Sequence, residues 1–256
     1  MARLIDVVAR LRGEGGCPWD REQTRASLRP YVIEEAFEVV EALDSGETRR
    51  IREELGDLLF QVVLHAQLSA ERGEFDLGDV AGDLAEKLVR RHPHVFGAER
   101  AKDAAAVAVR WEELKRGERA AKGEPPSALA GVPVALPALS RAQKVQDRAA
   151  RTGFEWPTLA AALAKVDEER RELGEALAAG DPAAIEAELG DLLFSVVSVA
   201  RAAKLNAEDA LRGTIRRFGE RFVRVEAAVL HSGREMRELT PAELGRLWDE
   251  AKSGEA

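Results

Sequence analysis

Apolar residues recur at helical spacing through most of the chain. Two apolar stripes follow one another in the second half, formed by Leu159, Leu163, Val166, Leu173 and Leu177 and then by Ile185, Leu189, Leu192, Val196 and Val199. Spacings of three, four and seven residues put such positions on one face of a helix. Alternating β-branched runs, which are typical of strands, are few. The pattern therefore predicts an all-α protein.

Nine helices are expected, at about residues 29–43, 48–72, 76–91, 103–117, 139–151, 157–179, 182–204, 206–231 and 240–252. Four of the ten prolines fall between Pro125 and Pro137, a stretch in which a helix cannot continue. We therefore expect an N-terminal domain at 1–122, a Pro-rich linker at 123–138 and a C-terminal domain at 139–256.

An acidic pattern occurs twice. The segments 34–38 (EEAFE) and 54–57 (ELGD) recur, with an offset of 134 residues, as 168–172 (EERRE) and 188–191 (ELGD). The apolar residues that follow each ELGD segment keep the same register. A repeat of this kind indicates two copies of one helical unit.

Turn signals between the acidic segments predict a helical hairpin in each copy. Gly180, Asp181 and Pro182 are typical of a helix stop, an N-cap and a first helical residue, and residues 44–47 take the same place in the first copy. The acidic segments lie about seven residues from the turn on either side, or roughly 10 Å along a helix. Because residues three apart share a helix face, the carboxylates should stand level across the hairpin at the rim of its core.

Carboxylates gathered in this way repel one another. Two unit charges about 4 Å apart cost about 4 kcal/mol at an effective dielectric constant near 20. A bound cation would offset the repulsion, and Mg²⁺ is the natural choice because it combines carboxylate oxygens with water or substrate phosphates. Mn²⁺ is a substitute. The alternatives are an ordinary solvated acidic face and a di-iron bundle, although the Glu-x-x-His spacing of the latter occurs in neither copy.

Composition narrows the choice of partners. The net charge is -8, and the 38 Lys and Arg are interspersed with 46 Asp and Glu, which argues against nucleic-acid binding through a broad basic surface. No apolar stretch approaches the roughly 18 residues of a membrane span, and the N-terminus lacks the apolar run of a signal peptide. The single Cys17 cannot form an internal disulfide. We expect a soluble, cytoplasmic protein that binds neither nucleic acid nor membrane.

The duplicated acidic pattern, with the segments 16–20 (GCPWD) and 90–96 (RRHPHVF), resembles the MazG family of nucleoside triphosphate pyrophosphohydrolases over essentially the whole chain. The resemblance implies tandem helical-hairpin domains of the four-helix-bundle, all-α NTP pyrophosphatase type. It also implies magnesium-dependent hydrolysis of nucleoside triphosphates to the monophosphate and pyrophosphate, and a homodimer whose helices complete one another's bundles. The alternatives are a narrow dUTP or dCTP pyrophosphatase and a catalytically weak, nucleotide-binding regulatory scaffold.

The resemblance also implies roles for individual residues. Metal ligands would be Glu169, Glu172, Glu188 and Asp191 in the second copy and Glu35, Glu38, Glu54 and Asp57 in the first. Nucleotide contacts would come from Lys165, Glu168, Arg217, Arg221, Trp248 and Lys252, in which cations bind phosphates and the aromatic ring faces the base. Core packing of Trp248 and a solvated face at Arg217 and Arg221 remain the alternatives. Candidates for the general base are Glu168 and Glu34.

The two copies differ upstream of the double glutamate, where the first has Tyr31 and the second has Lys165. The downstream basic pair is Lys87 with Arg91 in the first copy, and its Trp–Lys pair is Trp111 with Lys115. Replacing a phosphate-binding cation by a phenol removes a charge-assisted contact. We therefore expect the second copy to carry most of the turnover.

Overall fold

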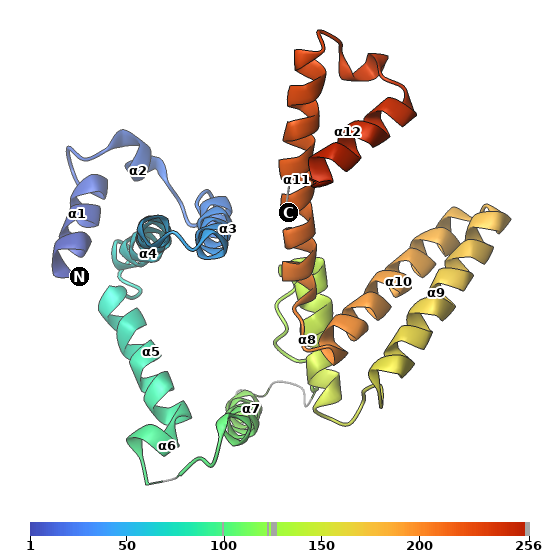
Figure 1. The fold of residues 1–256 in the computed structure, drawn as a ribbon. Coiled ribbons are helices and arrows are strands. Elements are labelled where there is room, and N and C mark those ends of the chain that lie inside the picture. The colour runs from blue at the N-terminus through green and yellow to red at the C-terminus, as the bar shows by residue number, and fades with distance from the viewer. Residues whose placement is uncertain (99, 122, 124–126, 254–256) are drawn as a thin grey trace. The chain divides into compact units, whose positions relative to one another are not determined.

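The structure is a computed structural model that describes residues 1–98, 100–121, 123 and 127–253. Within these ranges every regular element is a helix, which confirms the predicted all-α class. The chain divides into two compact units, Met1–Arg119 and Ala120–Ala256 (Figure 1). Of the predicted linker at 123–138, residues 124–126 lie outside the described residues.

The first unit contains seven helices in its described part. Their bounds are α1 (Ala2–Arg12), α2 (Pro18–Glu22), α3 (Arg29–Ser45), α4 (Thr48–Ala70), α5 (Leu77–Arg91), α6 (Pro93–Phe96) and α7 (Ala104–Ala121). The helices predicted from residue 29 onward are present, with ends that differ by at most a few residues. Helices α1, α2 and α6 were not predicted, and two of these are short turns that begin at a proline.

Helix α1 is held by packing against α4. Val8 is fully buried in a cluster with Leu64 and Leu28, and Arg12 forms an ion pair of 2.7 Å with Glu71 just after the end of α4. A signal for α1 exists in the sequence, since Leu4, Val8 and Leu11 lie at helical spacing. The charged residues between them weaken that signal, and the apolar face of α1 becomes buried only by packing against α4.

The second unit contains five α-helices and one 3₁₀ turn in its described part. These are α8 (Ala138–Ala150), α9 (Leu159–Ala179), α10 (Pro182–Ala202), α11 (Ala207–His231), η1 (Met236–Glu238) and α12 (Pro241–Ser253). Helices α9 and α10 form a long antiparallel hairpin, α8 packs on α10, and α12 folds back on α11 (Figure 1). The predicted helices of this half are all present.

The turn of each hairpin has the predicted geometry. Gly180 ends α9 with φ of 68°, a left-handed conformation that glycine adopts without strain. The Asp181 carboxylate then accepts from the backbone N–H groups of Ala183 and Ala184 at 3.0 and 3.4 Å, which caps α10. Gly46 plays the same part between α3 and α4, with φ of 70°.

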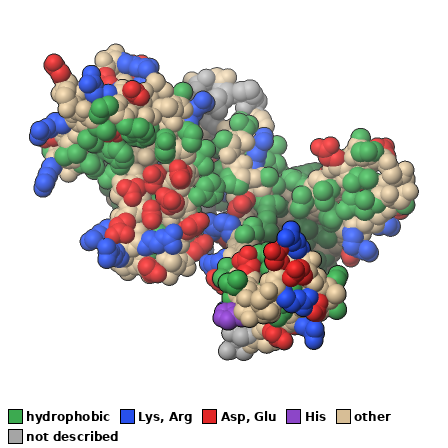
Figure 2. Space-filling model, turned by 90° about the horizontal axis from the view of Figure 1, so that it is seen from above, with side chains coloured by type: hydrophobic (Ala, Val, Ile, Leu, Met, Phe, Trp, Pro, Cys, Tyr) green, Lys and Arg blue, Asp and Glu red, His purple; other side chains and the backbone are tan. Residues whose placement is uncertain are grey.

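Much of the apolar stripe on the second hairpin is exposed in the single chain. Leu163 is 48% exposed, Leu177 58% and Leu189 46%, although the pattern predicts them as core positions. Figure 2 shows broad areas of hydrophobic side chains on the visible face of the molecule. Among the described helices, none combines the length and the apolar character that a membrane crossing requires. Leu163, Leu177 and Leu189 form an exposed apolar surface on the second hairpin.

Candidate metal and nucleotide site

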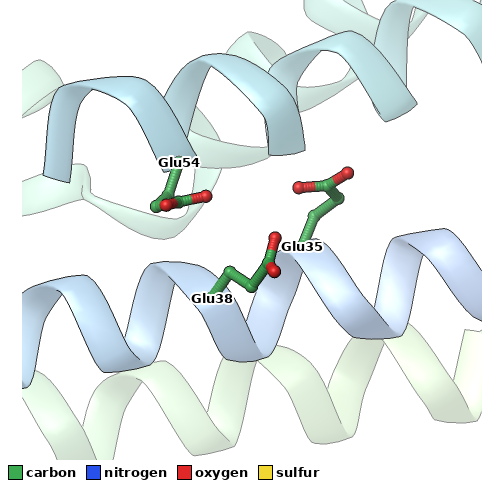
Figure 3. Close-up of side chains that lie close together, drawn as sticks. All are labelled: Glu35, Glu38 and Glu54. Atoms are coloured by element: carbon green, nitrogen blue, oxygen red, sulfur yellow. The ribbon is translucent and has the colours of Figure 1, made fainter. Parts of the chain in front are cut away.

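Three carboxylates of the first copy meet between the two helices of its hairpin. Glu35 and Glu38 project from α3 and Glu54 from α4, and all three point into the space between the helices (Figure 3). One carboxylate oxygen from each lies within 4.8 Å of the others. The predicted level arrangement across the hairpin is therefore present.

The electrostatics of this cluster reflect its crowding. Burial, followed by the negative charges of Asp57 and Glu38, raises the pKa of the Glu35 carboxyl above its ordinary value. A hydrogen bond from the Gln61 side chain acts in the opposite direction. Such a carboxylate gains from a nearby cation, because the cation replaces like-charge repulsion by attraction.

The second copy repeats the cluster with Glu169 and Glu172 from α9 and Glu188 from α10, again within 4.8 Å of one another. Glu169 is only 5% exposed. Its Oε1 pairs with Lys165 Nζ at 2.7 Å, while no partner within the described part of the chain reaches its buried Oε2. A buried carboxylate oxygen without a donor is a strong ligand for a cation.

Lys165 adds positive charge to this cluster, and Glu188 adds negative charge. The Lys165 ammonium contacts Glu169 and, at 2.9 Å, Glu168, and these hydrogen bonds raise its pKa, so it stays protonated. The pKa of Glu188 is raised by burial and then by the charges of Glu172, Glu169 and Asp191, while Lys165 opposes the shift. The cluster retains excess negative charge despite the lysine.

The two aspartates of the ELGD segments stand slightly apart. Asp57 and Asp191 are exposed and do not belong to the groups of three oxygens that lie within 4.8 Å. Both are still close enough to raise the pKa of a neighbouring glutamate, Glu35 in the first copy and Glu188 in the second.

The donor set fits a hard divalent cation. Mg²⁺ binds oxygen ligands at about 2.0–2.1 Å in an octahedron, and Ca²⁺ at about 2.3–2.6 Å, so oxygens within 4.8 Å of one another can share one ion. No histidine or cysteine takes part in either group, which disfavours Zn²⁺. Glu169, Glu172 and Glu188, and likewise Glu35, Glu38 and Glu54, could hold such an ion.

The model of the MazG nucleotide pyrophosphohydrolase domain matches the chain twice, over residues 23–96 and 158–225. The matched segments contain both acidic clusters and amount to more than half of the chain. The chain belongs to the MazG family. Its two acidic clusters thus lie in two tandem MazG domains, as the resemblance implies.

Relatives of the chain include proteins of nearly the same length. It is 45% identical over 256 residues to a nucleoside triphosphate pyrophosphohydrolase of Escherichia coli K12, covering 99% of this chain and 97% of that protein. It is 42% identical over 253 residues to a MazG pyrophosphohydrolase of Thermotoga maritima, covering 98% and 95%. The uncharacterized protein YabN of Bacillus subtilis is 42% identical over 250 residues, 97% of this chain and 51% of YabN.

The downstream residues expected from the MazG resemblance lie on α11 and α12, whereas the glutamates lie on α9 and α10. Arg217 is exposed and donates to Thr214 Oγ1 at 3.0 Å, Arg221 is half-buried, and Lys252 is exposed. The Trp248 ring lies 5.1 Å from the Phe218 ring and packs on the core between α11 and α12. Within one chain, Trp248 is therefore a packing residue.

The corresponding residues of the first MazG domain are engaged with one another. Arg91 lies over the Trp111 ring at 5.3 Å and pairs with Glu118 at 2.5 Å. Hydrogen bonds from Arg91, assisted by Arg90, lower the pKa of Glu118 to about 2. Lys115 lies 6.0 Å from the same ring and pairs with Glu112. Arg91 and Lys115 are thus each already paired with a glutamate of the same domain.

Two polar residues next to the first cluster were not predicted as site residues. Gln61 contacts Glu35 through its side chain, and His65 lies one turn further along α4. In the sequence, His65 is an isolated helical histidine with no neighbouring ligand type. Only the packing of α3, α4 and α5 shows that both line one cavity.

Proposed function

We propose that this protein hydrolyses nucleoside triphosphates to the nucleoside monophosphate and pyrophosphate in a magnesium-dependent reaction. The observation that carries the proposal is the cluster of Glu169, Glu172 and Glu188, in which a buried carboxylate oxygen has no donor among the described residues. Membership of the MazG family and the names of the full-length relatives support the same activity.

Each residue of the second copy has a proposed role. Glu169, Glu172, Glu188 and Asp191 would hold Mg²⁺, or Mn²⁺ as a substitute, with Glu35, Glu38, Glu54 and Asp57 as their counterparts in the first copy. When bound, such an ion neutralises phosphate charge and orients the attacked group. The hairpin holds the carboxylates of α9 and α10 at the same height, and this arrangement would fix the position of the ion.

Residues around the cluster would bind the nucleotide. The Lys165 ammonium is kept at the edge of the cluster by Glu168 and Glu169, where it can contact a phosphate oxygen. Arg217, Arg221 and Lys252 would add positive charge, and the half-buried Trp248 would offer the base the part of its ring that does not pack on Phe218. Glu168 is exposed beside the ligand set, so we propose it as the base that takes the proton of the attacking water, with Glu34 as its equivalent in the first copy.

We further propose that the active form is a homodimer. The exposed Leu163, Leu177 and Leu189 form an apolar surface on the hairpin that a single chain leaves uncovered. A two-helix hairpin is too thin to bury both of its apolar stripes, so further helices have to cover them. A second copy offers matching stripes and would bring the cations of α11 and α12 closer to a glutamate cluster.

We propose that the enzyme accepts a broad range of nucleoside triphosphates and that its physiological role is control of the nucleotide pool. The deciding experiment is a pyrophosphate-release assay with ATP, GTP, CTP, UTP and their deoxy forms, with Mg²⁺, with Mn²⁺ and with a chelator. Comparable pyrophosphate release from the nucleotides of all four bases, with either metal, supports the proposal. Release from dUTP or dCTP alone would favour a narrow pyrophosphatase. Absence of release from every nucleotide would favour a regulatory scaffold.

A further inference from the structure

A cavity of about 260 Å³ lies beside the acidic cluster of the first copy. Its walls come from α3, α4, α5 and the turn before α5, and they are almost entirely apolar. The lining residues are Val32, Leu58, Val62, Ala66, Phe75 and Val80, together with Gln61 and His65. Its volume is slightly below the range of about 300–1,000 Å³ that is typical of sites for whole drug-sized ligands, so one small ring system fits better than a complete nucleotide.

Two polar atoms interrupt the apolar lining. Gln61 is 5% exposed, and neither its Oε1 nor the buried Nε2 of His65 has a hydrogen-bond partner among the described residues. The amide group of Gln61 is oriented by its contact with the Glu35 carboxylate, which accepts hydrogen bonds and so takes the Nε2 end. Oε1 is therefore the acceptor left over, and a buried acceptor without a donor is unfavourable.

His65 is placed to act together with Gln61. The two residues are four apart on α4, so their side chains share one helix face. Burial and then the charge of Arg25 lower the pKa of His65, which keeps the imidazole neutral and able to donate or accept at Nε2. Arg25 also lies 5.8 Å from the Phe75 ring, which fixes the aromatic wall of the cavity.

The second copy lacks this polar pair. At the positions 134 residues later, Ser195 and Val199 replace Gln61 and His65, and the Ser195 hydroxyl donates to the Leu192 carbonyl of its own helix at 2.8 Å. Apolar lining residues of the hairpin itself are kept, with Val166, Leu192 and Val196 at the equivalents of Val32, Leu58 and Val62. The unpaired acceptor is thus a feature of the first copy.

We propose that this cavity of the first copy binds a nucleobase, with an N–H group of the base donating to Gln61 Oε1 and His65 Nε2 bonding the adjacent position on the base edge. Val32 lies one turn from Glu35, and Leu58 one turn from Glu54, so the acidic cluster stands at one end of the cavity. A triphosphate attached to the base would reach that cluster, a step which rests on the proposed function. The base-binding step itself does not.

Nucleosides are the probe, since they carry no phosphate and need neither metal nor turnover. The full-length protein, labelled with ¹⁵N, contains four histidines, so the ring nitrogens of His65 can be assigned and followed by NMR. Adenosine, guanosine, cytidine and uridine are titrated separately in the absence of metal. At least one of them should shift the His65 ring signals in a saturable way while His231 stays unchanged.

Variants identify the site. Gln61→Leu removes the acceptor at similar volume and should weaken nucleoside binding about tenfold. Gln61→Ser introduces the residue of the second copy and should also weaken nucleoside binding. Ala66→Leu fills the cavity and should abolish nucleoside binding. Ser195→Ala, at the matching position of the second copy, is the control and should bind like the parent. Thermal unfolding of each variant verifies that it is folded.

The proposal is overturned if none of the four nucleosides gives a saturable shift, which would mean that water alone fills the cavity, or if Gln61→Leu and Ala66→Leu bind as tightly as the parent. Pyrophosphate release is measured on the same samples. Pyrophosphate release without nucleoside binding would contradict the nucleobase site and leave the proposed function intact. Nucleoside binding without pyrophosphate release would contradict the proposed function and leave the nucleobase site intact.

Discussion

Glu169 shows how much of this site depends on a single buried carboxylate. It is 5% exposed and touches one cation, Lys165, through one of its two oxygens. A carboxylate offers about four acceptor positions, so most of its capacity is unused by the described side chains. Its neighbour Glu172 is more exposed and pairs with Arg171, which makes it a safer position for a test substitution.

Replacing Glu172 by Ala should lower magnesium-dependent hydrolysis by about 100-fold or more, because an ion held by the remaining oxygens loses its geometry. Asp191→Ala should act in the same direction. Both variants should keep their helical circular dichroism, since removing a negative charge relieves repulsion. Glu175→Ala, at an exposed position of α9 paired with Arg171, is the control. Near-normal turnover, or gross unfolding of the variants, would argue against a catalytic metal site.

The raised pKa of Glu188 makes stability depend on pH in a definite direction. A folded-state pKa above the ordinary 4.5 means that the folded protein binds this proton more tightly than the unfolded chain. Without metal, the Glu188 contribution to the free energy of unfolding therefore falls as the pH rises through and above 4.5. Replacement by Gln removes the penalty.

Glu188→Gln should accordingly melt at a higher temperature than the parent at pH 7 in the presence of a chelator, and the difference should vanish below about pH 4.5, where the carboxyl is protonated in both states. Calorimetry at a series of pH values measures this. Glu186→Gln, on another face of α10, is the control. A lower melting temperature for Glu188→Gln at pH 7 would contradict the electrostatic account.

At the scale of helices, local chemistry predicts most of the fold. The end of α9 and the start of α10 follow from Gly180, Asp181 and Pro182, each of which has a strong positional preference. Helix α1 escapes prediction because its stability comes from burying Val8 on α4, a contact between residues far apart in the sequence. Short helices such as α6 have too few residues to show a period.

The N-cap of α10 provides a test at this scale. Asp181→Ala removes an acceptor that two backbone N–H groups share, and it should lower the free energy of unfolding by about 1 kcal/mol. Asp181→Asn keeps an acceptor and should lie close to the parent. Chemical denaturation of both variants gives the comparison. Equal losses in the two variants would indicate that charge, and not the hydrogen bond, stabilises this end.

The candidate site is predictable only in part. Equal distances from the turn place the glutamates level, and the structure brings Glu35, Glu38 and Glu54 together as expected. The cavity with Gln61 and His65 depends on where Phe75 and Val80 pack, and no local pattern encodes that. Core packing of Trp248 is an alternative that the sequence leaves open, and the structure identifies Phe218 as the ring on which it packs.

At the scale of the whole molecule, the two domains share a framework but differ in the groups around it. Tyr31 contacts the Trp19 ring edge-on, with centroids 5.9 Å apart, and packs on the core of the first unit. Lys165, at the matching position, holds a charge beside its glutamates. The loss of a charge-assisted contact to phosphate corresponds to about 1.5–3 kcal/mol. At this position, therefore, the first domain has a packing residue and the second has a cation beside its glutamates.

We therefore predict that Glu172→Ala silences pyrophosphate release in the full-length protein, whereas Glu38→Ala leaves most of it. Steady-state turnover of both variants is measured with saturating Mg²⁺ and the best nucleotide from the substrate panel. Glu41→Ala, at an exposed position of α3 that pairs with Arg50 and has no role in the proposed site, checks for non-specific effects on the first hairpin. If Glu38→Ala silences the enzyme and Glu172→Ala does not, the roles of the domains are reversed.

Assembly is testable by mass. Light scattering at micromolar concentration should give twice the chain mass of 27.9 kDa. Leu177→Glu places a charge on a side chain that is 58% exposed in the single chain, and it should shift the mass toward the monomer. Arg170→Glu, an exposed charged position on the same helix, should not. A parent protein that stays at the monomer mass would refute the dimer.

The hairpin turn also limits how the length of these domains can change. One residue inserted into α9 between Glu172 and Gly180 would rotate the two sides of the insertion by about 100° and turn the glutamates away from α10. Seven inserted residues would restore the face to within about 20°, but they would raise Glu172 about 10 Å above Glu188. The tip of the hairpin can therefore lengthen or shorten only by about two helical turns at a time, and only when both helices change together.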